Sequence, residues 1–393
     1  MKGEKTAVSE PFSAAALGFL NTLSERLRHE KSLKKREDIQ AFAFWCRRAS
    51  LEQMKELYKK RHAGSLRLGK GLAFHIAPAN IPVMFAYTMA IGLLAGNSNL
   101  VRISGRSLEQ GGPLLKAIEA LLEEEKFGKL RTMIRFVSYD SREEDKTALY
   151  SALCDIRVIW GGDDTIKKIR SFPIKPGAWE ITFPDRYSAA FLRESRLKAL
   201  SGAELASLVH QFCADTYSID QNACSSPSAV FWERDRIRPQ KGKKAREMFW
   251  EMVSQEAKSY GILPIQISRK YGELCRLAAT SPALSGVLRY GNILYVAKIE
   301  KELLNAETLL SLRGRYGMFF EILLDDESDL PAFLPGKIQT LTCQKGDEEG
   351  IKRMLWRERV QGVDRVVPFG QALALNLIWD GMDLIERMSR EIR

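Results

Sequence analysis

The sequence predicts an α/β protein that is built on parallel sheets and divided into two or three domains. Helix-like and strand-like segments alternate along the chain, a pattern typical of α/β proteins rather than all-α or all-β ones. The 393 residues, 45% of them hydrophobic, are enough to bury a large core. Residues 71–138 run strand, helix, strand, helix, strand, which is the material of a nucleotide-binding parallel sheet.

The N-terminal half supplies that series. Residues 13–62 have helical spacing of apolar side chains and are expected to pack against the rest of the domain. Leu72–Ile76 is predicted to be a buried strand, and the helix Val83–Leu94 is expected to start near Asn80 and to end before Gly96. The remaining predicted elements here are strand 99–103, helix 114–125, strand 134–138, strand 156–160 and helix 165–169.

The C-terminal half repeats the alternation. The predicted elements are strand 189–192, helix 204–215, strand 229–232, helices 245–260 and 271–279, and strands 293–297, 319–324 and 338–343. From Arg365 onward we expect a helix-rich tail. No internal repeat or long linker interrupts the series.

The charge balance leaves three kinds of partner open. Lys and Arg total 60 against 49 acidic residues, giving a formal charge of +11, which is scattered apart from short clusters such as 234–246. A solvated surface is the favoured interpretation, followed by attraction of an anionic substrate or carrier. Nucleic acid is not expected as a partner, because no recognition helix, zinc-finger spacing or aromatic RNA-binding motif accompanies the charge.

The six cysteines show no paired close spacing and there are only four histidines, so no metal site is expected. The first twelve residues lack the apolar core of a signal peptide. The longest apolar run, 81–96, has 16 residues and is too short to span a bilayer comfortably. We therefore expect a reduced, cytoplasmic protein without a membrane span.

Cys224 is the strongest candidate for a catalytic residue. It lies in the polar, turn-prone stretch 220–227, between a predicted helix and a predicted strand. A thiol on a connection between packed elements is well placed to act as a nucleophile and to form a thioester. The alternative is a small buried cysteine, which is the interpretation favoured for the other five. His210 could serve as a Cys/His partner, but a structural role on its helix is favoured.

A second candidate site is the pair Gly161-Gly162, which follows a predicted strand and precedes a predicted helix. Such glycines let backbone N–H groups approach a pyrophosphate. The same residues also make an ordinary turn and helix cap, and no Gly-x-Gly-x-x-Gly is present. Both interpretations stay open.

Several motifs from residue 70 to the C-terminus carry a family resemblance. They are Ala77–Pro82, Ala95–Asn97 with Val101–Ser104, Ile159–Asp163, Asp220–Pro227, Phe320–Ile322, Lys337–Leu341 and Trp379–Gly381. In this order they resemble the aldehyde dehydrogenase superfamily, and most closely its bacterial acyl-CoA reductase branch, the fatty acid reductases first known from bioluminescence operons. The chain departs from the pattern at Arg102, where lysine is usual, and at Ile103, where proline is usual.

The resemblance implies an aldehyde dehydrogenase-like fold. Residues 1–190 would form N-terminal helices and a Rossmann-like cofactor domain, and residues 191–364 an α/β catalytic domain. Residues 365–393 would form a tail that returns to the cofactor domain, with the active site in the cleft between the two domains.

The resemblance also implies roles for individual residues. Cys224 would be the nucleophile, and the Asn80 amide would stabilise the oxyanion together with the Cys224 N–H. Helix N-capping is the alternative for Asn80. Glu180 lies near the position of the water-activating glutamate, although the usual Glu-Leu-Gly-Gly is missing. The implied cofactor residues are Arg102, Ser104, Arg106, Trp160, Gly161, Gly162 and Glu321.

The predicted activity is NAD(P)H-dependent reduction of an acyl thioester to an aldehyde through S-acyl-Cys224. NADPH is preferred over NADH because Arg102 and Arg106 could hold a 2′-phosphate; solvated surface is the alternative for Arg106. The expected substrate is acyl-CoA or an acyl carrier, with an acyl-protein synthetase as a possible partner and a homo-oligomeric state. The alternatives are an aldehyde-oxidising dehydrogenase, which needs a general-base carboxylate, and a non-catalytic subunit of a reductase complex.

Overall fold

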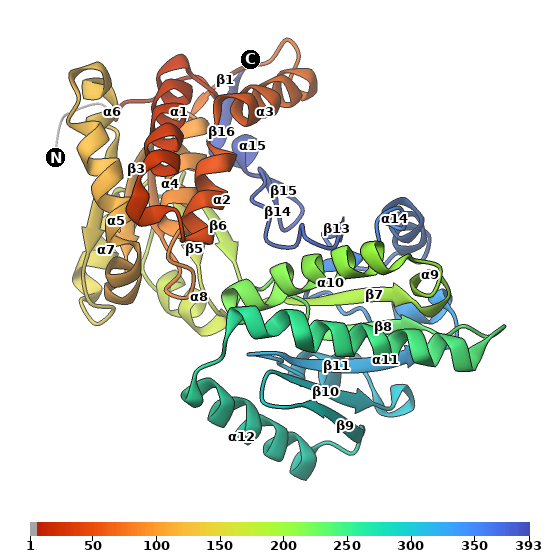
Figure 1. Ribbon diagram of the computed structural model, residues 1–393. Coiled ribbons are helices and arrows are strands. Elements are labelled where there is room, and N and C mark those ends of the chain that lie inside the picture. Colours follow the sequence, from red (N-terminus) through yellow and green to blue (C-terminus); the bar gives the residue numbers. More distant parts are fainter. Residues whose placement is uncertain (1–5) are drawn as a thin grey trace. The chain divides into compact units, whose positions relative to one another are not determined.

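The computed structural model describes residues 6–393, and the chain divides into two compact units (Figure 1). Unit 1 contains the residues up to Asp185 together with Leu375–Arg393. Unit 2 contains Arg186–Ala374. Each unit is built on its own largely parallel sheet.

The sheet of unit 1 has five strands in the order β4-β3-β2-β5-β6, and all neighbours are parallel. Its strands are β2 (Leu72–Ile76), β3 (Ser98–Ile103), β4 (Ile134–Ser138), β5 (Ile156–Trp160) and β6 (Trp179–Phe183). The connecting helices are α4 (Met84–Leu94), α5 (Gly105–Leu122), α7 (Glu144–Leu153) and α8 (Asp163–Arg170). This order is that of a doubly wound sheet, as the sequence predicted.

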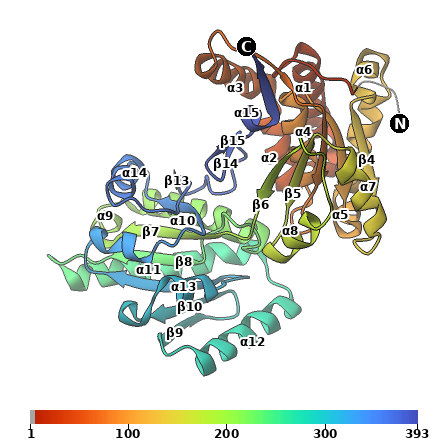
Figure 2. The same cartoon turned by 180° about the vertical axis from the view of Figure 1, so that it is seen from behind.

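Helices cover both faces of this sheet (Figures 1 and 2). On one face α4 and α5 share a core with the N-terminal helices α1 (Ala14–His29) and α2 (Glu37–Trp45), while α3 (Arg48–Arg61) packs at the margin. Apolar side chains of α7 and α8 pack on the other face. β2 and β5 are almost entirely buried and consist mostly of apolar residues, as expected for strands covered on both faces. These two strands and β4, whose Arg135 and Ser138 are exposed, were predicted to the residue.

The C-terminal segment of unit 1 is mostly extended, so the predicted helix-rich tail is wrong. It contains the hairpin β14 (Ile378–Trp379) and β15 (Met382–Asp383), the short helix α15 (Leu384–Met388), and β16 (Ser389–Ile392). β16 pairs antiparallel with β1 (Leu66–Gly69), more than 300 residues earlier in the chain. The pairing strand comes from the other end of the sequence, and local spacing carries no sign of it.

The sheet of unit 2 has seven strands in the order β13-β12-β7-β8-β11-β10-β9, and only the β9–β10 pair is antiparallel. Its strands are β7 (Tyr187–Arg193), β8 (Ala229–Glu233), β9 (Leu284–Tyr290), β10 (Leu294–Ile299), β11 (Met318–Leu324), β12 (Ile338–Cys343) and β13 (Arg365–Pro368). Helices α10 (Gly202–Thr216) and α11 (Pro239–Glu256) pack on one face. Helices α12 (Pro264–Thr280), α13 (Ala306–Ser311) and α14 (Glu348–Arg357) pack on the other.

Among residues 6–393, no helix is long and apolar enough to cross a membrane. The same residues contain no group of three or more His, Cys, Asp or Glu side chains arranged to hold a metal ion.

Candidate functional site

The carboxyl edge of the unit 1 sheet gathers most of the residues that the sequence assigned to a cofactor. Because the strands are parallel, the chain leaves β2, β3 and β5 at one edge. Asn80 follows β2, Ser104 follows β3 and Gly161 follows β5. The chain runs outward in opposite directions from the neighbours β2 and β5, and such a switch point is where open α/β sheets bind ligands. Strand order therefore brings three predicted segments to one ligand-binding edge.

Arg102 is the residue at this edge with unused hydrogen-bonding capacity. Its guanidinium lies over the Tyr139 ring, 4.8 Å from the centroid, and its Nη2 donates to the Tyr139 carbonyl at 3.2 Å. Its Nε is buried and has no hydrogen-bond partner in the structure. Ser104 caps α5 by accepting from the Ser107 N–H, and Arg106 is exposed in the first turn of that helix. An anion at the end of β3 would satisfy the Arg102 donor.

The Gly161-Gly162 turn has the geometry of a helix start. A Cβ on Gly161 would lie 2.9 Å from Thr165 Cγ2, and Gly162 is the N-cap of α8. Asp163 and Asp164 occupy the first turn of α8, where carboxylates are stabilised by the helix dipole. A pyrophosphate at this terminus would meet two negative charges. The ordinary turn and cap therefore fit the local electrostatics better, and the phosphate role of this pair stays a prediction.

Trp160 belongs to the core of unit 1. Its ring stacks on Phe183 with centroids 3.7 Å apart and meets Trp379 edge-on at 5.4 Å. Its Nε1 donates to Thr88 Oγ1 at 3.1 Å. The indole is thus fully engaged in packing, and the contact unites two motifs that lie more than 200 residues apart in the sequence.

Asn80 lies exposed on the segment between β2 and α4. The N-cap of α4 is Val83, and no side chain makes a capping hydrogen bond there. The N-cap alternative for Asn80 is therefore wrong, and the helix begins at Met84 rather than at the predicted position. The oxyanion role of Asn80 remains a prediction.

Glu180 sits near the start of β6 between two arginines of unit 1. Its carboxylate accepts from Arg157 Nε at 2.8 Å and from Arg170 Nε at 2.6 Å. Arg157 is only 2% exposed, so the pair is largely desolvated. A carboxylate held by two guanidinium groups is a poor general base, and this geometry favours a structural role.

Cys224 lies on a tight turn at the amino end of β8 in unit 2. The turn closes with a hydrogen bond from the Ser226 N–H to the Ala223 carbonyl. Asp220 and Gln221, just before it, both have left-handed backbone conformations with φ of 56° and 55°. Such consecutive residues are strained unless their surroundings hold them, and strain of this kind is concentrated at functional sites.

Hydrogen bonds with three other elements, β11, β7 and α10, hold the turn. Gln221 is buried; its Oε1 accepts from the Gly317 N–H at 2.8 Å, and its Nε2 donates to the Met318 carbonyl at 3.2 Å. Ser188 on β7 donates to the Cys224 carbonyl at 2.6 Å. Ser226 donates to the Asp215 carbonyl of α10 at 2.7 Å. The backbone around the thiol is therefore fixed on several sides.

Burial distinguishes Cys224 from most of the other cysteines. Cys46, Cys154, Cys213 and Cys343 are buried, whereas Cys224 is half-buried. Burial raises the pKa of the Cys154 thiol to about 11 and that of Cys343 to about 12, and it raises those of Cys46 and Cys213 as well. Since the thiolate is the nucleophile, these four thiols are inert near neutral pH. Cys275 is exposed on α12 and serves as an internal comparison.

His210 is placed away from the role of a Cys/His partner. It is exposed on α10, where its Nδ1 lies 2.8 Å from Glu256 Oε1 of α11. This contact links the two helices at the surface, in agreement with the structural role favoured from the sequence.

Glu321 is enclosed within unit 2. It is 3% exposed, its Oε2 accepts from Trp250 Nε1 at 2.7 Å, and Arg246 Nε lies 3.4 Å away. Burial raises the pKa of Glu321, while Arg246 and Trp250 oppose that rise. Arg246 also pairs with the buried Glu194. The Glu321 carboxylate is therefore engaged by Trp250 and Arg246, and its proposed role at the nicotinamide ribose stays a prediction.

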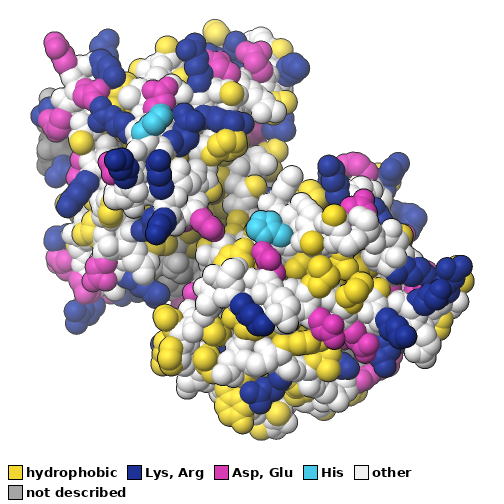
Figure 3. Space-filling view, in the orientation of Figure 1, with side chains coloured by type: hydrophobic (Ala, Val, Ile, Leu, Met, Phe, Trp, Pro, Cys, Tyr) yellow, Lys and Arg dark blue, Asp and Glu magenta, His cyan; other side chains and the backbone are white. Residues whose placement is uncertain are grey.

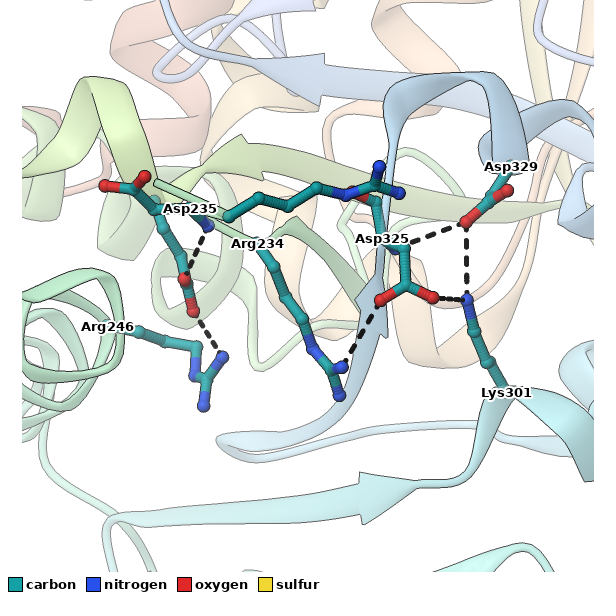
Figure 4. A network of polar contacts seen from close by, with 8 residues as sticks. Arg234, Asp235, Arg246, Lys301, Asp325 and Asp329 are labelled. Atoms are coloured by element: carbon teal, nitrogen blue, oxygen red, sulfur yellow. Dashed lines mark hydrogen bonds and ion pairs between the residues drawn. The ribbon is translucent and has the colours of Figure 1, made fainter. Parts of the chain in front are cut away.

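The carboxyl edge of the unit 2 sheet carries a network of ion pairs (Figure 4). Arg246 reaches the buried end of the network, and Arg234 pairs with Asp325 at 3.3 Å near the surface. Lys301 contacts both Asp325 and Asp329. Close by, Arg193 pairs with Glu233, Glu327 and Asp347. The cations at this edge are each paired with carboxylates, although Glu233 Oε2 and Asp347 Oδ2 are buried without a hydrogen-bond partner in the structure.

Sequence reasoning missed the residues that support the Cys224 turn. Ser188, Asp215 and Lys270 had no assigned role, and Lys270 donates to the carbonyls of Asn292, Ile293 and Tyr316. The Gly317 loop was also missed, although two glycines in Gly314–Gly317 marked a tight turn. Asp215 is 11 residues from its partner Ser226, whereas Ser188 and Met318 lie 36 and 97 residues from theirs, so strand pairing is needed to bring these last two to the turn.

The family model of the acyl-CoA reductases (LuxC) matches residues 19–266, more than half of the chain. The chain belongs to this acyl-CoA reductase family. The match contains the Asn80 segment, the Arg102 strand and the Cys224 turn. No curated protein matches the sequence.

Solved structures of aldehyde dehydrogenases share the fold of this family member. An NAD-dependent benzaldehyde dehydrogenase from Corynebacterium glutamicum matches with a TM-score of 0.63 at 13% identity, over 98% of this chain and 85% of that one. An indole-3-acetaldehyde dehydrogenase in complex with NAD⁺ matches with a TM-score of 0.65 at 12% identity, over 96% and 82%. Proline utilization A from Bradyrhizobium japonicum matches at 0.64 and 14% over 98% of this chain, which spans 43% of that longer protein. The fold is therefore of the aldehyde dehydrogenase type.

Proposed function

We propose that this protein reduces an acyl thioester to an aldehyde through an S-acyl intermediate on Cys224. Membership of the acyl-CoA reductase family supports the reaction class. The observation that carries the proposal is the half-buried Cys224 on a turn held by Gln221, Ser188 and Ser226, while four other thiols are buried and inert.

The chemistry of a thiol suits this reaction. The Cys224 thiolate attacks the acyl carbon, the bond from that carbon to the carrier sulfur breaks, and the carrier leaves as a thiol after taking up a proton. One thioester replaces another of similar energy. The oxyanion formed on the way accepts hydrogen bonds from the Cys224 N–H and, in this proposal, from the exposed Asn80 amide.

Reduction completes the cycle. A bound reduced nicotinamide supplies the hydrogen and two electrons that turn the acyl group into an aldehyde and return Cys224 to the thiolate. The buried Arg102 Nε without a partner fits an anionic group of such a cofactor at the end of β3. Arg102 and Arg106 would read a 2′-phosphate, which favours NADPH over NADH. Ser104 would lie beside the adenosine ribose.

The geometry of Glu180 weighs against aldehyde oxidation. An oxidiser must hydrolyse its acyl-enzyme, and hydrolysis needs a general base. Glu180 is held by Arg157 and Arg170 instead. Without an activating base, the acyl group on Cys224 persists until it is reduced. The acyl donor in this proposal is acyl-CoA or a carrier-bound acyl group, with an acyl-protein synthetase as a candidate donor and a homo-oligomer as the expected assembly.

The test is acyl labelling of Cys224 in the absence of reductant. Purified protein is mixed with radiolabelled acyl-CoA, and we expect a hydroxylamine-sensitive adduct on the peptide that contains Cys224. Adding NADPH should discharge the adduct as aldehyde. Cys224→Ala should abolish both adduct and turnover, whereas Cys275→Ala, which removes the exposed thiol of α12, should leave both unchanged. Turnover that survives Cys224→Ala would remove the mechanism.

A further inference from the structure

The connection between β8 and α11 carries a concentration of positive charge. Six exposed basic residues lie within eleven positions: Arg234, Arg236, Arg238, Lys241, Lys243 and Lys244. In Figures 1 and 2 this connection projects from the edge of unit 2, and Figure 3 shows Lys and Arg side chains gathered at that edge. We call residues 234–244 the basic tip.

Ile237 stands in the middle of the basic tip with 88% of its surface exposed. Aliphatic side chains of this size are usually buried, so such exposure is unusual. Further along, Lys241, Lys244 and the 44%-exposed Met248 follow one stripe of α11 at helical spacing. The basic tip therefore presents aliphatic surface surrounded by cations.

The conformation that exposes Ile237 is held from within unit 2. The N–H groups of Ile237 and Arg238 donate to Asp235 Oδ1 at 3.1 Å and 3.0 Å. Asp235 is 4% exposed, pairs with Lys198, and donates its own N–H to Glu194 at 3.0 Å. Figure 4 shows Asp235 between the Arg246 end and the Arg234 end of the ion-pair network. The apolar side chain is thus held outward by a buried anchor.

Much of the positive charge has no acidic partner. Arg234 pairs with Asp325, Arg236 donates to the Asp325 carbonyl, and Lys243 lies 3.9 Å from Glu247. Within the described structure, Arg238, Lys241 and Lys244 have no acidic side chain within ion-pair distance. These three exposed cations follow Ile237 within seven positions of the chain and remain available to an anionic surface.

Among anionic ligands, a lipid bilayer fits this combination best. A bilayer with anionic headgroups attracts Lys and Arg, and its interface accepts an aliphatic side chain. Single-stranded nucleic acid is bound by aromatic side chains that stack on bases, and the basic tip has none. A second copy of this chain docked symmetrically would place like charges together.

We propose that the basic tip docks this protein on anionic membrane surfaces, with Ile237 entering the interface and Arg238, Lys241 and Lys244 contacting lipid phosphates. The attachment is peripheral and reversible, since one aliphatic side chain gives a weak anchor. The proposal does not depend on the reductase activity. The two would complement each other, because long acyl chains and aldehydes partition into bilayers.

The test is co-sedimentation of the full chain with two kinds of vesicle. One contains phosphatidylcholine alone, and the other also contains about 30% phosphatidylglycerol as the anionic lipid. We expect binding only to the anionic vesicles, weakened by salt. Each basic residue contributes roughly fivefold to partition, so Arg238→Glu/Lys241→Glu/Lys244→Glu should lower it at least about 100-fold. Ile237→Ser should lower it about 10-fold. The matched control Lys34→Glu/Lys35→Glu/Lys60→Glu changes the net charge equally at exposed sites of unit 1.

Ile237→Trp gives a second readout, since an indole that enters the interface shifts its emission to the blue with anionic vesicles only. The charge-reversal residues are exposed, and acidic residues are favourable near the start of α11, so this variant should fold. If the two triple variants lose vesicle binding equally, the net positive charge of the whole protein causes the binding, and the proposal for the basic tip is wrong. Binding to an acidic protein or to nucleic acid without vesicle binding would overturn the proposal, as would self-association that Ile237→Ser abolishes.

Discussion

The two parallel sheets of this chain differ in the edge that carries chemistry. In unit 1, all the predicted cofactor residues except Glu321 lie where the strands end, beside the switch point between β2 and β5. In unit 2, Cys224 lies before β8, where the strands begin. Both sheets are doubly wound, so topology alone would have placed a ligand at the carboxyl edge of each.

The two carboxyl edges differ in whether the buried donors of their cationic side chains already have partners within the same unit. At the edge of unit 1, the buried Arg102 Nε has no partner, so a ligand can supply one. At the edge of unit 2, Arg193, Arg246 and Lys301 are each paired with carboxylates of the same unit. The cations of the unit 2 edge are therefore occupied, whereas Arg102 keeps a buried donor that an anion would satisfy.

The largest expected effect is a loss of stability in Arg246→Ala, which tests whether the ion pairs at the carboxyl edge of unit 2 are structural. Arg246→Ala leaves Glu194 and Glu321 buried without their cation. Breaking a buried pair in this way costs about 3–5 kcal/mol of unfolding free energy, which denaturant unfolding would measure. At low temperature, the rate of Cys224 alkylation should stay unchanged, because the thiol lies at the other edge.

Arg234→Ala is the matched control for this prediction. It removes an arginine of the same network, but its pair with Asp325 is exposed on both sides. Such pairs contribute less than about 1 kcal/mol. Equal destabilisation by the two variants, or a change in Cys224 alkylation with Arg246→Ala alone, would break the division between the edges.

At the amino edge of the unit 2 sheet, the buried carboxyl group of Asp215 is held by backbone N–H groups and not by an arginine. This difference predicts that the free energy of unfolding depends on pH. Asp215 accepts from the N–H groups of Gly370 and Ala372 at 2.7 Å and 2.9 Å, and burial raises its pKa to about 7. Between pH 4 and 7 the folded state keeps this proton while the unfolded state has lost it. The stability is therefore present below pH 4 and declines as pH rises to about 7.

The size of the decline is up to about 4 kcal/mol, from three pKa units at roughly 1.4 kcal/mol each. Unfolding free energies at pH 5 and pH 7 would cover two of these units, a decline of roughly 2–3 kcal/mol, and Asp215→Asn should flatten the difference. Glu194→Gln at the carboxyl edge is the comparison, since that carboxylate is held by Arg246. An unaltered pH dependence in Asp215→Asn would assign the effect to other groups.

How far the sequence could predict this fold depended on burial. The strands Leu72–Ile76 and Ile338–Cys343 were predicted to the residue, and both are almost entirely buried because both faces of each sheet are covered. The tail after Arg365 was predicted helical and is mostly extended. β13 pairs with β12, β14 with β15 and β16 with β1, and only the last partner lies far away in the chain. Helical spacing reports none of these pairings.

In the candidate site too, local features were predictable from the sequence and contacts between distant residues were not. The Cys224 turn was visible because its residues are polar and contiguous. The role of Gln221 was not, because its partners at Gly317 and Met318 lie almost 100 residues away. Glu180 was chosen for its position in the sequence, yet the neighbouring strand brings Arg157 against it. Spacing identifies a reactive residue more readily than it identifies the contacts that support or neutralise it.

The next effect concerns the amino edge of unit 2. Gln221→Leu keeps the size of the side chain but removes its hydrogen bonds to Gly317, Met318 and Pro227. A displaced thiol should lower kcat/KM for acyl-CoA about 10- to 100-fold, as misplacement of a reacting group typically does. Gln266→Leu, which removes one bond to Asp220 and one from the Leu263 N–H outside the turn, should cost less. Nicotinamide affinity, measured by fluorescence titration, should stay unchanged in both, and a parallel loss would contradict a local role.

The smallest effect concerns the carboxyl edge of unit 1. Arg102→Gln removes the guanidinium whose Nε lacks a partner, and we expect the Kd for NADPH to rise about 10-fold, near the low end for a lost charge-assisted hydrogen bond. Arg106→Gln removes an exposed arginine of α5 and should raise it less. The Kd for NADH, which lacks the 2′-phosphate, should change little in either variant.

Two outcomes would contradict this prediction. If Arg102→Gln raises the Kd of both nucleotides equally, Arg102 orders the sheet edge through its contacts with the Tyr139 ring and carbonyl and does not bind the 2′-phosphate. If neither nucleotide is affected, the unused donor is not part of a ligand site, and the contrast between the two carboxyl edges fails at its starting point.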